Sequence, residues 1–145
     1  MNIKPVALLF TVTLSACGQP SGDAQNENPR HYDPLRLAQG ERTFHTHCST
    51  CHGWNGEGQA GWQKPGPNGA LLPPPLDNNG RTARLNSKQI MAFIRQGSPD
   101  GRGAMPAWEN KLSMREIDDL TLWITSLWSD RIYLEWQTKI EQDAR

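Results

Sequence analysis

The sequence Cys48-Ser49-Thr50-Cys51-His52 decides how the rest of the chain is interpreted. Two cysteines three positions apart lie on one turn of backbone, so their sulfurs can reach the two vinyl groups of a single porphyrin. The next residue is a histidine, whose imidazole then lies beneath the ring and can bind the iron. The pattern therefore predicts covalent attachment of one haem c through Cys48 and Cys51, with His52 as an axial iron ligand.

Other uses of a Cys-x-x-Cys pair fit this sequence less well. A thioredoxin-like redox pair is expected in βαβ surroundings, which the flanking sequence does not provide. Half of a zinc site would need a second pair of ligands, and the sequence contains no such pair. A disulfide between the two cysteines would give His52 no reason to follow them directly.

The composition predicts one small domain with many turns. The chain has 145 residues, of which 36% are hydrophobic, and it contains Gly 13 times and Pro 11 times. A core built from so few apolar side chains is marginal, and a buried porphyrin would supply the missing apolar volume. The 15 Lys and Arg balance the 15 Asp and Glu, so the chain lacks the excess positive charge expected of a nucleic-acid-binding protein.

The first residues predict an exported, lipid-anchored protein. Residues 1–16 combine a short basic start, an apolar run and small residues before Cys17, as in a signal peptide. The apolar run is too short to cross a bilayer as a helix, and a buried strand is its alternative interpretation. The segment Leu-Ser-Ala-Cys ending at Cys17 resembles the lipobox of bacterial lipoproteins, in which the cysteine is acylated. This resemblance implies a membrane anchor on the periplasmic side, and Gly18 after the cysteine favours the outer membrane.

Four segments are expected along the chain. Residues 1–16 are the signal peptide, 17–32 the lipidated cysteine and a tether, 33–128 the haem domain, and 129–145 a C-terminal amphipathic helix extension. The tether is almost free of apolar side chains and cannot repay the entropy of folding, so we expect it to be flexible.

Capping residues and apolar side chains at spacings of three and four predict four helices. These helices are expected over residues 33–48, 87–96, 113–127 and 129–141. Asp33, Ser87 and Ser113 are the expected N-caps of the first three. Pro34 follows Asp33 at the first helical position, and Glu116 completes a capping box with Ser113. Between the first two helices the chain is rich in Gly, Pro and Asn, which predicts loops.

The pattern Gly40-x-x-x-Phe44, followed by the haem motif and by Gly-x-x-Gly-x-Gly, resembles the opening of a class I c-type cytochrome. In that family this glycine packs against an aromatic residue of the last helix, which here implies contact between Gly40 and Trp123. The resemblance also implies an all-α cytochrome c fold, with three to five helices and Gly- and Pro-rich loops wrapped around one covalently bound haem.

Residues 71–76, Leu-Leu-Pro-Pro-Pro-Leu, resemble the Gly-Pro-x-Leu segment of the same family. The proline carbonyl of that segment accepts a hydrogen bond from the proximal imidazole, which fixes the ring and adjusts the basicity of the ligand. The distance from Leu76 makes Pro74 the matching residue, but three successive prolines without a preceding glycine leave the register open. A polyproline II segment with only a structural role is the alternative.

Met105 is the candidate for the second axial ligand. It lies in the sequence Gly-Arg-Gly-Ala-Met-Pro-Ala-Trp, residues 101–108, and such a loop can present a thioether sulfur from the face opposite His52. The segment resembles the family's Met-Pro-Ala-aromatic distal motif, which implies that Met105 binds the iron. The alternative is an apolar loop residue that covers a five-coordinate haem.

Several other residues near the motif have open roles. His45 and His47 lie on the helix that leads into the motif and approach the ring from its attached side, which disfavours a bis-histidine site. Arg102 either pairs with a haem propionate or faces solvent. Trp54 and Trp62 either flank the porphyrin or are partly exposed loop aromatics.

If His52 and Met105 occupy both axial positions, no site remains for a substrate. We therefore expect a carrier of single electrons between a donor and an acceptor protein of an exported respiratory chain, acting as a monomer and not as an enzyme. The alternatives are a peroxidase-like haem enzyme or a sensor of small ligands, each of which needs an open distal position. The near-neutral charge gives no indication of the partners.

Overall fold

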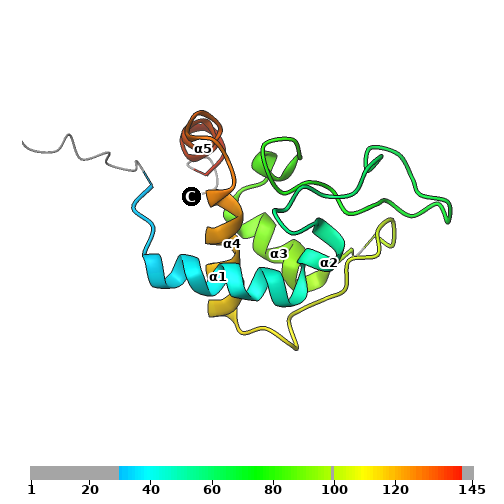
Figure 1. Cartoon of the computed structure of the whole chain (residues 1–145), viewed down its shortest axis with the longest axis horizontal. Coiled ribbons are helices and arrows are strands. Elements are labelled where there is room, and N and C mark those ends of the chain that lie inside the picture. Colours follow the sequence, from blue (N-terminus) through cyan, green and yellow to red (C-terminus); the bar gives the residue numbers. More distant parts are fainter. Residues whose placement is uncertain (1–29, 99, 142–145) are drawn as a thin grey trace, which may run out of the picture. The chain divides into compact units, whose positions relative to one another are not determined.

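The computed structural model describes residues 30–98 and 100–141, and its folded unit begins at His31. The predicted signal peptide, Cys17 and the tether as far as residue 29 lie outside the described residues. Within them the chain forms helices and irregular loops, with isolated β-bridges but no named strand (Figure 1). The elements are α1 (Pro34–His47), α2 (Ser49–His52), the 3₁₀ turn η1 (Thr82–Arg84), α3 (Ser87–Gln96), α4 (Met114–Ser126), α5 (Asp130–Trp136) and the π-helical turn η2 (Gln137–Glu141).

The start of α1 is set by two adjacent residues, as the sequence predicts. Asp33 is the N-cap, and its Oδ1 accepts the backbone N–H of Leu35 at 2.9 Å. Pro34 occupies the first helical position, where its missing N–H has no intrahelical partner to lose.

The core lies where α4 crosses α1 (Figure 1). Gly40 permits this crossing, because a Cβ there would lie 2.0 Å from the carbonyl oxygen of Asp119 and 2.9 Å from Cβ of Trp123. The ring of Phe44 packs on that of Trp123, with centroids 4.2 Å apart. The predicted contact between Gly40 and Trp123 is therefore confirmed.

An ion pair joins the same two helices. Arg36 on α1 donates through Nε to Oδ1 of Asp119 at 2.6 Å and through Nη2 to Oδ2 of Asp118 at 2.5 Å. The side chain of Asp119 is only 3% exposed, so its charge is compensated mainly by Arg36, with Arg115 at 4.0 Å. Removing one partner of such a pair leaves a buried charge without compensation.

The N-cap expected for α3 was wrong by one residue. Asn86, not Ser87, is the cap: its Oδ1 accepts the N–H of Gln89 at 2.9 Å, and Oε1 of Gln89 accepts the N–H of Asn86 at 3.0 Å. Asn followed three residues later by Gln makes a reciprocal capping box, whereas Ser87 is followed by Ile90, which cannot complete one. The capping box of Ser113 and Glu116 at the start of α4 is confirmed.

The C-terminal tail forms the predicted helix in two parts. Ser129 caps α5, which continues into η2. The hydroxyl of Thr138 donates to the carbonyl oxygen of Leu134 at 2.8 Å, a side-chain bond that competes with the backbone and accompanies the wider turn. Tyr32, expected at the end of the tether, already contacts this tail through an edge-on ring contact with Tyr133 at 5.9 Å.

Candidate haem site

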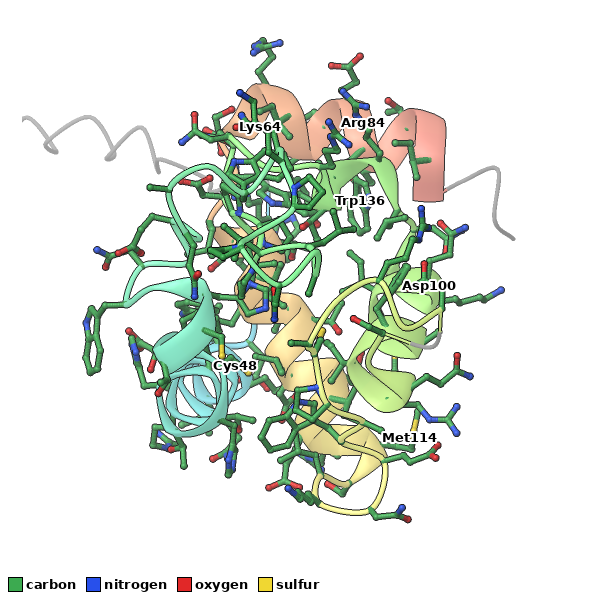
Figure 2. The ribbon with its side chains drawn as sticks, turned by 90° about the vertical axis from the view of Figure 1, so that its right-hand side faces the viewer. Cys48, Lys64, Arg84, Asp100, Met114 and Trp136 are labelled. Carbon is green, nitrogen blue, oxygen red and sulfur yellow. The ribbon has the colours of Figure 1, made fainter. Side chains whose placement is uncertain are left out.

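The attachment residues lie at the junction of α1 and α2 (Figure 2). The N–H of Cys48 closes α1 on the carbonyl oxygen of Phe44 at 2.8 Å, and the N–H groups of Cys51 and His52 both bond to the carbonyl oxygen of Cys48, at 3.0 and 2.9 Å. This single turn brings both cysteines and the histidine together. Cys48 is half-buried and Cys51 is exposed, and neither forms a disulfide.

The protonation of Cys48 argues against a redox dithiol. Burial raises the pKa of its thiol to about 11, with a smaller contribution from the neighbouring Cys51. Reactive pairs of the thioredoxin type need a lowered thiol pKa, because the thiolate is the nucleophile. Among the described residues, no group of three or more His, Cys, Asp and Glu side chains that could hold a metal ion is found.

The imidazole of His52 is buried and held through one nitrogen. Its Nδ1–H donates to the carbonyl oxygen of Pro74 at 2.9 Å, so Pro74 is the one of the three prolines that accepts a hydrogen bond from His52. Burial lowers the pKa of His52 below its ordinary 6.5, against an opposing effect of this hydrogen bond. The ring is therefore neutral at pH 7, with Nδ1 occupied and the lone pair of Nε2 available for a metal.

The chain after α2 holds the proline-rich segment against His52. The N–H of Gln59 bonds to the carbonyl oxygen of Pro73 at 3.0 Å, and the N–H of Leu76 to that of Gly56 at 2.7 Å. Gly58 has φ +72°, and a Cβ there would lie 2.3 Å from the nitrogen of Pro75. A glycine is thus required where the loop passes closest to the prolines.

Met105 is presented by a loop that is tied to the end of α3. Its carbonyl oxygen accepts the N–H of Ser98 at 3.0 Å, and the N–H of Trp108 returns to the carbonyl oxygen of Ile94 at 3.2 Å. Gly97 has φ +70°, and a Cβ there would lie 2.3 Å from the carbonyl oxygen of Met105. The side chain of Met105 is half-buried and packs against the core.

The loop that carries Met105 also contacts the segment that carries Pro74. The N–H of Leu71 bonds to the carbonyl oxygen of Arg102 at 2.6 Å, and Leu71 forms an isolated parallel bridge with Gly103. The candidate proximal and distal segments are therefore connected directly.

The other residues considered near the haem motif make contacts of their own in the structure. The ring of His45 stacks on that of Trp54 at 3.9 Å, and the ring of His47 lies 5.0 Å from that of Trp108, at the end of the Met105 loop. Arg102 pairs with Asp100 at 2.6 Å and is 76% exposed. Trp54 is 64% exposed, and the guanidinium carbon of Arg81 lies 5.3 Å from the ring centroid of Trp62. Both tryptophans are therefore partly exposed loop aromatics.

These residues fit a covalently bound haem. Two cysteines that form no disulfide and a neutral imidazole lie on one turn, and the imidazole has Nε2 available. Apolar side chains that pack on the core while remaining partly exposed, among them Leu76, Met91 and Met105, can cover an apolar macrocycle. Burial of such a group would extend a core that is otherwise small.

Residues 35–124, more than half of the chain, match the family of cytochrome c oxidase, cbb3-type, subunit III. The chain belongs to this family. The cytochrome is 28% identical over 95 residues to a cbb3-type cytochrome c oxidase subunit FixPc of Rhizobium leguminosarum bv. viciae, a match that covers 66% of the cytochrome but only 29% of that subunit. It is 33% identical over 87 residues to cytochrome c6 of Leptolyngbya boryana, covering 60% of the cytochrome and 87% of the relative.

Among solved structures, cytochrome CL of the marine methylotrophic bacterium Methylophaga aminisulfidivorans MPT aligns with a TM-score of 0.53 and 26% identity, over 78% of the cytochrome and 70% of that chain. The class I c-type family and the all-α cytochrome c fold are therefore confirmed. The cytochrome is an electron-transfer protein with one covalently bound haem c. The iron ligands and the role of Pro74 toward the haem remain predictions.

The sequence did not indicate the contacts of the last two tryptophans. Trp128, which follows the C-cap Leu127 of α4, donates its indole Nε1–H to the carbonyl oxygen of Leu76 at 2.8 Å, and Trp136 on α5 donates to that of Leu85 at 2.7 Å. A buried tryptophan signals that its N–H has a partner, but not which one.

Proposed function

We propose that the cytochrome carries one electron at a time between partner proteins of an exported respiratory chain, and that His52 and Met105 are the residues that would bind its haem iron. The observation that carries this proposal is the fixed loop around Met105, whose carbonyl oxygen is bonded to Ser98 and whose end is bonded back to α3. A methionine on a fixed loop favours a permanently occupied sixth position. An enzyme or a ligand sensor would need that position to open.

The chain's own residues prepare this site. The hydrogen bond from Nδ1–H of His52 to Pro74 orients the ring and makes its other nitrogen a stronger donor. The half-buried side chain of Met105 would supply a weaker sulfur donor and help to exclude water. The haem c supplies the one-electron couple of iron. His52 and Met105 would both remain bound in either oxidation state, so little rearrangement would accompany electron transfer.

We place the cytochrome on the periplasmic side of a bacterial membrane, anchored through acylated Cys17, with the outer membrane favoured. The support is the lipobox-like sequence and the small residue after it. No helix among the described residues is long and apolar enough to cross a membrane. Relatives named as an oxidase subunit and as cytochrome c6 support redox proteins as donor and acceptor. We expect a monomer that does not bind nucleic acid.

The test is the absorption spectrum of the haem-loaded protein before and after the change Met105→Ala. We expect sharp low-spin bands on reduction and a weak near-infrared sulfur-to-iron band on oxidation, which Met105→Ala removes. Met114→Ala is the matched control, because Met114 is 54% exposed at the start of α4 and its loss should leave the band intact.

Carbon monoxide provides a second measurement on the unaltered protein. It should leave the spectrum of the reduced wild-type protein unchanged and shift that of Met105→Ala. A high-spin wild-type spectrum that responds to carbon monoxide at modest concentration would mean an open distal position. The carrier function would then give way to the peroxidase-like enzyme or the sensor.

A further inference from the structure

The three prolines give the segment next to His52 an unusual hydrogen-bonding problem. Pro73, Pro74 and Pro75 have no N–H, so between residues 73 and 76 only Leu76 can donate a backbone hydrogen bond. The position of the segment therefore depends on donors that reach its carbonyl oxygens from elsewhere. The carbonyl of Pro74 is the one that accepts from His52.

A side chain from the end of α4 supplies one of these donors. The indole Nε1–H of Trp128 donates to the carbonyl oxygen of Leu76 at 2.8 Å, two positions after Pro74. Trp128 is only 2% exposed, and its ring packs edge-on against that of Trp136 at 5.3 Å. The donor is therefore held in place and shielded from water, where a hydrogen bond is most costly to lose.

The residues on both sides of Trp128 hold the same region. The N–H of Ser129 donates to Oδ1 of Asn78 at 2.8 Å. The side chain of Leu127 lies against Gly56, where a Cβ would be 2.9 Å from its Cδ1, and the carbonyl of Gly56 accepts the N–H of Leu76 at 2.7 Å. Residues 127–129 thus fasten the segment that follows Pro74.

We propose that Trp128 is a positioning residue for His52: by holding Leu76, it keeps the carbonyl of Pro74 at hydrogen-bonding distance from Nδ1–H. This inference rests on the proposed function in that His52 is the iron ligand. A stronger bond at Nδ1 makes the imidazole a better donor and stabilises oxidised iron. Loss of the Trp128 bond should therefore weaken the His52 bond and raise the reduction potential.

The chain offers a matched pair of variants. Trp128→Phe keeps an aromatic ring in the core, but it removes the indole N–H together with part of the indole ring system. Trp136→Phe does the same at a site that is also buried, 7% exposed, but its acceptor Leu85 lies eleven positions after Pro74. Figure 2 shows Trp136 beneath the tail helix. The two variants should lose similar stability, so a structural role alone would not separate them.

Two readouts on the haem-loaded protein separate them. We expect Trp128→Phe to raise the reduction potential and to make exchange of the His52 Nδ1 proton roughly fivefold faster in the reduced state, as followed by nuclear magnetic resonance. Trp136→Phe should leave both at their wild-type values. Equal behaviour of the two variants in both readouts would overturn the proposal.

A second variant covers the case in which Trp128→Phe does not mature. Asn78→Ala removes the acceptor of the Ser129 N–H at an exposed position and creates no core cavity. We expect a smaller rise in potential and a smaller acceleration of exchange, and no change in either would count against the proposal. The near-infrared band of the wild-type protein tests Met105 separately, so failure of the carrier function is distinguishable from failure of this inference.

Discussion

The substitution Gly40→Ala tests the helix crossing that closes the fold. A Cβ at this position would lie 2.0 Å from the carbonyl oxygen of Asp119, about 1.4 Å short of an ordinary contact, and 2.9 Å from Cβ of Trp123. Two of the atoms it meets belong to the backbone of Asp119, so a side-chain rotation cannot relieve the clash and α1 and α4 must separate. Overpacking of this kind costs roughly 3 kcal/mol at the upper end of its usual range.

An opposing effect must be subtracted, because alanine is a better helix former than glycine by about 1 kcal/mol. The expected net loss in the free energy of unfolding is about 2 kcal/mol, or a decrease in Tm of about 10 °C for a domain of this size. Thermal unfolding of the oxidised haem-loaded protein measures it. Glu41→Ala on the exposed face of α1 is the control and should change stability by less than about 0.5 kcal/mol. If Gly40→Ala were as stable as the wild type, helix propensity would dominate and the close crossing would be refuted.

Two further predictions concern charged groups. Arg36→Leu leaves the carboxylate of Asp119, which is 3% exposed, without its main partner, so urea unfolding should show a loss of about 2 kcal/mol in the free energy of unfolding. Asp118→Ala, at the exposed end of the same ion pair, should cost less than about 1 kcal/mol. Equal losses in the two variants would contradict the assignment of Asp119 as the main partner of Arg36. The hydrogen bonds from the Ser113 N–H and hydroxyl hold the pKa of Glu116 in the folded protein below its ordinary 4.5. The ionised Glu116 therefore stabilises the folded state above pH 4.5, and this contribution is lost as the pH falls through the lower folded-state pKa. Glu116→Gln should remove this part of the pH dependence, and a wild-type-minus-variant difference in the urea midpoint that does not change with pH would contradict it.

Local patterns predicted the helices because their causes are local. The cap Asp33 and the capping box at Ser113 involve residues within one turn of each other, and both are present in the structure. The prediction of Ser87 as the N-cap was wrong because the preceding Asn86 can also cap a helix, and only the partner three positions later distinguishes the two. The missed signal was Gln89, whose side chain completes the box with Asn86.

The candidate site was predicted in part because its spacing is short. Cys48, Cys51 and His52 are brought together by a single helical turn, and no long-range contact is needed to align them. Pro74 could be selected only by comparison with a family segment, since three prolines offer three registers in the sequence. The loop geometry after Gly53 decides between them, and no periodicity encodes it.

The tail could not be placed from its apolar periodicity, because a period identifies the buried face of a helix and not the surface that it meets. Buried donors and acceptors that must find hydrogen-bond partners indicate which surfaces meet. Three consecutive prolines leave a run of carbonyl oxygens next to a single N–H, while a buried tryptophan must find an acceptor for its indole N–H. In the structure, the indole N–H of Trp128 donates to the carbonyl oxygen of Leu76, 52 residues earlier in the chain. These two requirements together favour a contact between the proline-rich segment near the haem motif and Trp128, the tryptophan that directly precedes the C-terminal extension.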